Sequence, residues 1–277
     1  PGTGIELTVV REGETKPLTI SIVRDIIKIE SVYSKIIENE NILYVRVVNF
    51  DKNIVGDVQD AITKNKNVKG IVLDLRNNPG GLLNQAVGLV DIFIDEGIIV
   101  SQKGRVESEN AEYKATKSGT NTKLPLVVLV NGGSASASEI VSGALQDHKR
   151  AIIIGEKTFG KGSVQAVLPV VDNEAIRLTI ARYYLPSGRT IQAEGVTPDI
   201  VVYPGDVPHK NNEQELKEKD LKKHLESELK KVDDNKTDTK ETKTKAKTKE
   251  TTKSDKEIVS QENLFKEYSP LTRQIVL

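Results

Sequence analysis

Two runs of almost continuous apolar residues each lead into a turn of small residues and then into a segment with helical spacing. The runs cover residues 70–76 and 126–130, and the segments that follow them are residues 82–93 and 137–147. Strands that are apolar on both faces are typical of parallel sheets, because crossover helices cover such sheets. The alternation predicts an α/β fold with a mixed, mainly parallel sheet and covering helices. We expect further strands at residues 42–50, 151–154, 164–170, 175–184 and 200–203, and a helix at residues 55–62.

The two ends of the chain differ from this core. Residues 1–23 are expected to form a strand pair, because apolar and polar residues alternate near their start. Residues 206–256 predict a charged linker, and the stretch 233–256 has no large apolar residue, so it cannot bury enough surface to fold. Apolar residues return in 257–277, which predicts a segment that docks on a folded surface of its own chain or of a second subunit. In the second case the protein would be a homo-oligomer. A solvated charged tail without a role is the alternative.

The composition excludes several classes of function. The 277 residues hold 40 lysines and arginines and 40 aspartates and glutamates, so no net charge points to nucleic acid or to an anionic membrane. The absence of cysteine excludes thiol nucleophiles, disulfides and thiolate zinc sites, and three histidines argue against a multi-histidine metal site. We expect neither a metal nor a cofactor. The chain has no methionine, no apolar stretch of the ~20 residues that a membrane helix needs, and no signal-peptide pattern at Pro1, so we expect a processed or excised piece.

A turn of small residues before the helix at 137–147 holds the candidate nucleophiles. Residues 131–139 read Asn-Gly-Gly-Ser-Ala-Ser-Ala-Ser-Glu, so Ser134, Ser136 and Ser138 compete for this role. A serine at the start of a helix lies beside free backbone N–H groups that stabilise negative charge. The alternative is that one of these serines only caps the helix.

A lysine between two glycines follows 25 residues after Ser136. Lys161 lies in the sequence Phe-Gly-Lys-Gly, at the start of a predicted strand and without an aspartate beside it. A lysine acts as a general base only when it is neutral, and burial without a carboxylate partner favours the neutral amine. A serine and a lysine in these settings predict amide hydrolysis by a Ser-Lys pair.

Asp147 is an unsuitable third member of such a site. It lies 11 residues after Ser136 in the same predicted helix, which separates the two by ~16 Å along the axis. We expect Asp147 to have a structural role at the helix end, or to pair with Lys149 or Arg150. The neighbouring His148 is equally distant, which argues against a serine–histidine triad.

Five motifs occur in a fixed order along the chain. They are Asp-Leu-Arg-Asn-Asn-Pro-Gly-Gly-Leu at 74–82, Ser-Ala-Ser-Glu at 136–139, Ala-Leu-Gln-Asp at 144–147, Thr-Phe-Gly-Lys-Gly-Ser-Val-Gln at 158–165 and Ala-Arg-Tyr-Tyr-Leu-Pro-Ser-Gly-Arg at 181–189. In this order they resemble the carboxyl-terminal processing proteases, also called tail-specific proteases. The resemblance covers residues from about 25 to 203.

The resemblance implies a role for each matching residue. It makes Ser136 the nucleophile, Lys161 the general base and Gln165 the residue that positions this lysine. Backbone N–H groups of Ala137 and of the turn at Gly80 and Gly81 would form the oxyanion hole. On a straight strand Gln165 would lie ~13 Å from Lys161, so the glycines around the lysine have to bend the chain.

The resemblance also implies the fold, the domains and the location. It predicts a crotonase/ClpP-like spiral core at residues 24–205, and it makes residues 1–23 the closing strands of a truncated PDZ domain. It places the protein outside the cytoplasm, in the bacterial cell envelope or secreted.

The leading interpretation is therefore a serine endopeptidase that binds protein tails as an extended strand and cleaves them through an acyl-enzyme. Two alternatives stay open. One is a peptide-binding scaffold of the same fold without activity, and the other is a crotonase-like enzyme that acts on acyl thioesters with the Gly80-Gly81 turn as its oxyanion hole.

Overall fold

The computed structural model describes residues 1–26, 30–37, 39–117, 123–171, 174–203 and 216–221. The chain divides into two compact units, residues 1–30 and residues 31–277, which are described separately. The predicted docking segment and most of the predicted linker lie outside the described residues. The division of the chain into domains therefore stays a prediction.

The first unit is an antiparallel strand pair. Strand β1 (Gly4–Val9) pairs along its whole length with β2 (Leu18–Val23), so that Gly4 lies opposite Val23 and Val9 opposite Leu18. This confirms the strand pair expected in residues 1–23. Its assignment to a PDZ domain remains a prediction.

The second unit is built on a six-stranded sheet. Its order is β12-β9-β8-β5-β4-β3, and all neighbours are parallel except β3 and β4. The two apolar runs form its centre as β5 and β8, and most of their side chains are buried. The mixed, mainly parallel sheet of the predicted α/β fold is thus confirmed. The strands are β3 (Val32–Ile37), β4 (Ile42–Val47), β5 (Gly70–Asp74), β8 (Leu126–Val130), β9 (Ile152–Gly155) and β12 (Ile200–Val201).

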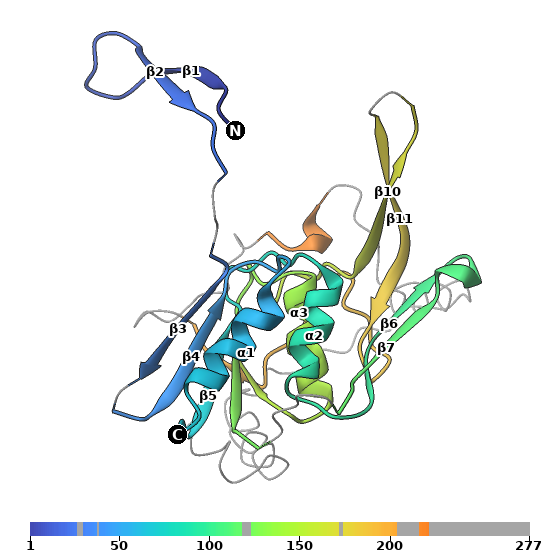
Figure 1. The fold of residues 1–277 in the computed structure, drawn as a ribbon. Coiled ribbons are helices and arrows are strands. Elements are labelled where there is room, and N and C mark those ends of the chain that lie inside the picture. Colours follow the sequence, from blue (N-terminus) through green and yellow to red (C-terminus); the bar gives the residue numbers. More distant parts are fainter. Residues whose placement is uncertain (27–29, 38, 118–122, 172–173, 204–215, 222–277) are drawn as a thin grey trace, which may run out of the picture. The chain divides into compact units, whose positions relative to one another are not determined.

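Three helices pack on one another and on the sheets. Helix α1 (Ile54–Lys64) contacts β3, β4 and α2 (Leu83–Asp91), and α2 contacts α3 (Ala137–Asp147). Figure 1 shows α1 and α2 side by side in front of the sheet. Helix α1 buries only Ile54, Val58 and Ala61, as expected of an amphipathic surface helix. In contrast, every residue of α3 from 137 to 145 is buried, so this helix lies inside the protein.

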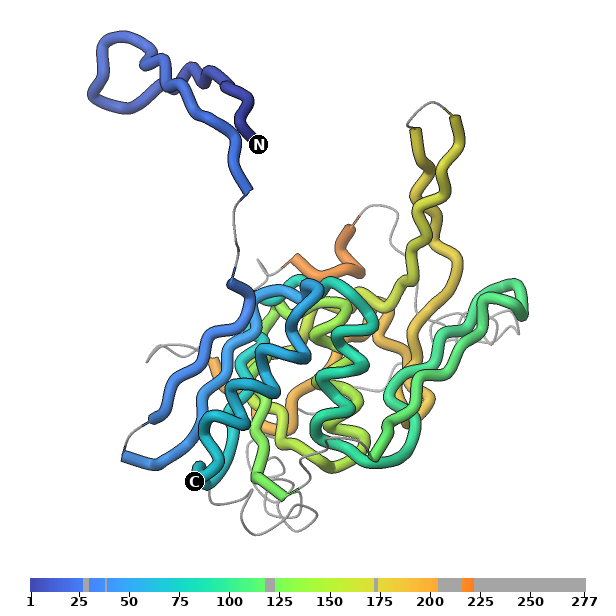
Figure 2. The backbone as a smooth tube through the Cα atoms, in the orientation of Figure 1, coloured from blue at the N-terminus to red at the C-terminus, as the bar shows by residue number. Residues whose placement is uncertain are grey.

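A second, antiparallel sheet has the order β10-β11-β6-β7. Figures 1 and 2 show β10 and β11 as a hairpin that projects beyond the body of this unit. These two strands were predicted, whereas β6 and β7, like β3 of the first sheet, were not. The strands are β6 (Ile98–Gly104), β7 (Ala111–Lys114), β10 (Ser163–Pro169) and β11 (Ala175–Tyr184), and short 3-10 turns occur at Glu107–Glu109 and Glu218–Asp220.

The C-terminal end of α3 is held by the loop that follows β11. Asp147 forms an ion pair with Arg189 at 2.9 Å and accepts a hydrogen bond from the backbone N–H of Ser187 at 2.9 Å. Arg189 was not among the predicted partners of Asp147, because it comes from a loop that is distant in the sequence. The ring of His148 contacts the carbonyl oxygen of Ile98 at 2.7 Å. Because α3 is one continuous helix, both residues lie at the end remote from Ser136.

These contacts predict that Asp147→Ala destabilises the protein more than it slows chemistry at Ser136. Loss of the ion pair and of the Ser187 hydrogen bond is expected to cost about 1–2 kcal/mol of unfolding free energy, or a few degrees in melting temperature. The measurement is thermal unfolding by circular dichroism beside the rate of fluorophosphonate labelling of the folded fraction. A folded variant whose labelling slows by several orders of magnitude would contradict this role.

Candidate active site

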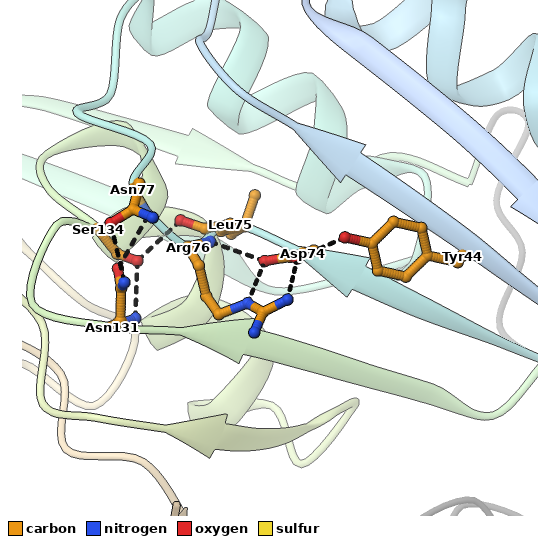
Figure 3. Close-up of polar contacts among 7 residues, drawn as sticks. All are labelled: Tyr44, Asp74, Leu75, Arg76, Asn77, Asn131 and Ser134. Carbon is orange, nitrogen blue, oxygen red and sulfur yellow. Dashed lines mark hydrogen bonds and ion pairs between the residues drawn. The ribbon is translucent and has the colours of Figure 1, made fainter. Parts of the chain in front are cut away.

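Two loops meet where the central strands β5 and β8 end. Because these strands are parallel neighbours, the loops after them leave the same edge of the sheet. Figure 3 shows the side chains that join them. Asn131 accepts a hydrogen bond from the backbone N–H of Asn77 at 2.8 Å, and its own amide donates to Asn77 Oδ1 at 2.9 Å. Two hydrogen bonds between the same two residues thus fix the loops to each other.

A buried aspartate fixes the start of the first loop. Asp74 accepts hydrogen bonds from the backbone and guanidinium of Arg76 and from the Tyr44 hydroxyl, at 2.6–2.9 Å (Figure 3). Burial alone would raise the pKa of Asp74, but these hydrogen bonds outweigh it and hold the pKa below its usual value. The carboxylate stays ionised and holds the chain as it leaves β5.

Two of the three candidate serines have structural hydrogen bonds. Ser134 Oγ donates to the carbonyl oxygen of Leu75 at 2.8 Å and accepts from the N–H of Asn131 at 3.0 Å. Ser138 Oγ donates to the carbonyl oxygen of Asn78 at 2.9 Å. Both side chains are fully buried, whereas Ser136 is partly exposed. Ser136 is itself the N-cap of α3 and forms a capping box with Glu139, so the capping role expected of one serine falls on it. Its exposure nevertheless makes it the most accessible of the three hydroxyls.

Ser136 has an unusual backbone conformation immediately before α3. Its φ and ψ are 54° and −110°, a backbone conformation that residues other than glycine rarely adopt. The Gly80 turn packs directly against it, since a Cβ on Gly80 would lie 2.9 Å from Ser136 Cβ and 3.0 Å from Ala137 N. The structure thus brings together the predicted nucleophile and the predicted oxyanion turn.

The backbone donors near Ser136 are not all available. The N–H of Gly80 donates to Asn78 Oδ1 at 2.9 Å. Among the described residues, the N–H groups of Gly81 and Ala137 have no protein acceptor. The neighbours of Gly81 are held by Phe50, which donates to Gly80 O at 2.9 Å and accepts from Leu82 N at 2.8 Å. The N–H of Ala137, which directly follows Ser136, and the N–H of Gly81 therefore remain candidates for the predicted oxyanion hole.

The buried carboxyl group of Glu139 connects the serine turn to the lysine segment. Its Oε2 accepts from the backbone N–H groups of Ser136 at 2.8 Å and Lys161 at 2.9 Å, so these nitrogens lie at most about 6 Å apart. Its Oε1 accepts from the Thr158 hydroxyl at 2.5 Å and the Gly160 N–H at 2.7 Å. One fully buried side chain thus positions both predicted catalytic residues.

Burial raises the pKa of Glu139 to about 7, although its four hydrogen bonds favour the charged form. In the sequence, Glu139 stands out only as the last residue of the Ser-Ala-Ser-Glu motif. A glutamate three residues after a serine at a helix start is a capping-box signal, and this signal was available in the sequence. Its contacts with Thr158 and Gly160 come from tertiary structure, and no local pattern predicts them.

The glycines around Lys161 permit close backbone contacts. Gly160 has φ +102° and its carbonyl accepts from the N–H of Ala193 at 2.8 Å, while a Cβ on Gly162 would lie 2.5 Å from Gln192 N. Lys161 itself is partly buried. Within the described ranges, no hydrogen bond joins the Lys161 ammonium to the Ser136 hydroxyl. The structure connects the two residues through their backbones.

Gln165 lies apart from this network. It is exposed on β10, opposite Thr179, where the register between β10 and β11 shifts. Among the described residues Gln165 makes no side-chain hydrogen bond. Its role in positioning Lys161 therefore stays a prediction. The described ranges also contain no group of three His, Asp or Glu side chains that could hold a metal ion.

Comparison with known proteins identifies the family. The sequence profile of peptidase family S41 matches residues 41–202. The chain belongs to this family. A carboxy-terminal-processing protease of Bartonella bacilliformis is 48% identical over 231 residues, which are 81% of this chain and 53% of that protein. The carboxy-terminal processing protease CtpA of Bacillus subtilis is 38% identical over 201 residues, which are 72% of this chain and 42% of that protein.

A solved structure agrees with this assignment to family S41. The photosystem II D1 C-terminal processing protease superposes with a TM-score of 0.59 and 33% identity, covering 75% of this chain and 57% of that one. The resemblance to processing proteases inferred from the motifs is thus confirmed. The chain spans about half the length of the curated relatives that it matches.

The burial of Glu139 predicts a pH dependence of stability. The pKa of Glu139 is about 7 in the folded protein and 4.5 ordinarily, so between these values the unfolded chain binds fewer protons. The free energy of unfolding should therefore receive a contribution from Glu139 that falls as pH rises from about 4.5 to 7, on the order of 3 kcal/mol in total. Urea unfolding across this range should show a slope that Glu139→Gln removes.

The matched control is Glu40→Gln, which changes an exposed glutamate of the same unit and should keep the slope of the native chain. Glu139→Gln should also slow labelling of Ser136, because an amide has one acceptor oxygen and places an N–H₂ group against backbone donors. Equal pH slopes in the native chain and in Glu139→Gln would show that Glu139 is not the titrating group.

Proposed function

We propose that this protein is a serine endopeptidase that cleaves protein tails through a Ser-Lys pair and an acyl-enzyme. The observation that carries the proposal is the shared Glu139 oxygen, which holds the backbones of Ser136 and Lys161 close together beside two free N–H groups. The names of the relatives support the substrate class, since they are carboxy-terminal processing proteases.

In the proposed reaction, Ser136 Oγ attacks the carbonyl carbon of the scissile peptide while Lys161 Nζ takes its proton. The flexible four-carbon stem of lysine is long enough to span the distance that Glu139 sets between the two backbones. The N–H groups of Ala137 and Gly81 stabilise the oxyanion of the tetrahedral intermediate, together with the N-terminus of α3.

The intermediate then collapses as the Lys161 ammonium protonates the leaving amine, which leaves an ester on Ser136. Water attacks this ester with the amine of Lys161 as base again, and the acid product and free serine are released. In this proposal Gly80 contributes by its missing side chain, because its own N–H is bonded to Asn78. Gln165 is proposed to orient Lys161 once substrate is bound.

Substrate is proposed to bind as an extended strand at the edge of a sheet. Strand β10 is an edge strand of the four-stranded sheet and begins two residues after Lys161. This supports β10 as the strand along which a protein tail is held.

We further propose that the core has the crotonase/ClpP-like spiral arrangement, that residues 1–23 close a PDZ domain, and that the protein works outside the cytoplasm. No helix in the described part of the chain is long and apolar enough to span a membrane.

Ser136→Ala should abolish both peptidase activity and fluorophosphonate labelling, by at least about a thousandfold, and leave folding intact. Ser134→Ala and Ser138→Ala remove buried hydrogen bonds, so these variants should be less stable but should keep measurable turnover. The assay is cleavage of unfolded casein beside cleavage of an acyl thioester. Thioester turnover without casein cleavage would favour the crotonase-like alternative, and unlabelled native protein would favour the inactive scaffold.

Lys161→Arg should be as inactive as Lys161→Ala, although it keeps the positive charge. A guanidinium group is not deprotonated at working pH, so it cannot accept the proton of Ser136. The measurement is the rate of acylation by a fluorophosphonate, with circular dichroism to confirm folding. Substantial activity of Lys161→Arg would exclude lysine as the base.

A further inference from the structure

A short turn from the C-terminal part of the chain contacts the loop that precedes the predicted base. This 3-10 turn, Glu218–Asp220, is drawn in orange in Figure 1. The residue before it, Lys217, donates from its ammonium group to the carbonyl oxygen of Lys157 at 2.9 Å, across a sequence separation of 60 residues. The backbone N–H of Glu218 donates to the carbonyl oxygen of Phe159 at 3.2 Å. Two neighbouring residues therefore bind alternate carbonyls of one loop.

The turn is fixed by its own hydrogen bonds. The N–H of Lys217 donates to Asp220 Oδ2 at 2.9 Å, and the N–H of Asp220 donates to Lys217 O at 3.0 Å. Lys217 and Glu218 are partly buried, whereas Lys219 is exposed. The turn lies beyond residues 41–202, which the profile of family S41 matches, so the family match does not include this contact.

Phe159 connects this turn to the serine turn. Its N–H donates to the carbonyl oxygen of Ser134 at 3.0 Å, while its carbonyl oxygen accepts from Glu218. Ser134 lies two residues before the predicted nucleophile, and Lys161 lies two residues after Phe159, so that their Cα atoms are at most ~7 Å apart. Through one residue, the contact with Glu218 thus reaches both predicted catalytic segments.

The loop before Lys161 depends on contacts of this kind. Two glycines flank the lysine, and glycine loses more conformational freedom on ordering than any other residue. From the interior the loop is held by Thr158, whose N–H donates to the carbonyl oxygen of the buried Val196 at 3.1 Å and whose hydroxyl donates to Glu139. The C-terminal turn adds the contacts to the carbonyls on either side of Thr158.

We propose that Lys217 and the N–H of Glu218 are positioning groups for the reaction at Ser136. They act through the loop that they bind, and they hold it so that Lys161 reaches the serine hydroxyl. They take no part in the proton transfer itself. The inference rests on the proposed peptidase function. A displacement of ~1 Å in such a site can cost about a hundredfold in rate, so loss of either contact should be visible in turnover.

The first test removes the backbone donor alone. Glu218→Pro deletes this N–H, and proline suits the first position of a helical turn after an extended residue, which Lys217 is with φ −109° and ψ 163°. Glu218→Ala is the comparison, because it loses the same side chain and keeps the N–H. Per folded molecule, as measured by circular dichroism, Glu218→Pro should cleave a fluorogenic peptide with a kcat about tenfold below that of Glu218→Ala. KM should be the same in both, because substrate binding is not affected.

The second test removes the side-chain donor. Lys217→Met should lower kcat about three- to tenfold at unchanged KM, and should slow fluorophosphonate labelling of Ser136 by the same factor. Lys217→Arg should recover most of the loss, because a guanidinium group also donates to a carbonyl. The matched control is Lys219→Met, which changes the exposed lysine of the same turn and should keep the native kcat.

Equal kcat in Glu218→Pro and Glu218→Ala would overturn the inference, as would a Lys217→Arg that is no faster than Lys217→Met, or losses confined to KM. The Lys217 pair decides alone if Glu218→Pro does not fold. Failure of the peptidase function itself looks different, because the native chain would then not cleave the peptide, or cleavage would survive Ser136→Ala.

Discussion

The arrangement of the site depends on one buried carboxyl group. The Oε2 atom of Glu139 accepts from the backbone N–H groups of Ser136 and Lys161. Its Oε1 atom accepts from the Thr158 hydroxyl and the Gly160 N–H. A second contact joins the same two segments, since Phe159 N donates to Ser134 O at 3.0 Å. The pKa of about 7 shows that burial of this group is unfavourable, and the fold tolerates it because four donors surround the carboxylate.

The other half of the site is built from side-chain amides. Asn77 and Asn131 tie the loops after β5 and β8 together. Asn78 uses its side chain on Val47 O and Gly80 N and its carbonyl on Ala135 N and Ser138 Oγ. The turn at Gly80 and Gly81 is thus held from both sides, and a fixed backbone of this kind is what the proposed oxyanion hole needs.

Much of this fold could be predicted from the sequence. The buried strands β5 and β8 and the helices after them have strong local patterns, because each is apolar over its full length or along one stripe. Strands β3, β6 and β7 were missed for a physical reason. Strands β3 and β7 lie at sheet edges and have many exposed positions, so pairing with a neighbour stabilises them rather than their own composition. Strand β6 lies inside its sheet, but only its first three residues are apolar, and the Ser-Gln-Lys-Gly run that follows gives no strand pattern.

The choice among the three serines was beyond any local pattern. The hydroxyls of Ser134 and Ser138 donate to Leu75 O and Asn78 O, which come from a distant part of the chain. The family resemblance selected Ser136, and its role as nucleophile stays a prediction, since the same residue also caps α3. The partner of Asp147 was missed in the same way, because Arg189 arrives on a loop far along the sequence.

The burial of α3 has a consequence for the electrostatic field at Ser136. Residues 137–145 are enclosed, so dissolved ions do not reach the body of the helix. Ser136 is partly exposed at the N-terminus, so salt screens the helix dipole from this end. The field at Ser136 therefore depends on what covers this one end of the helix, and a protein chain that covers Ser136 also shields it from salt.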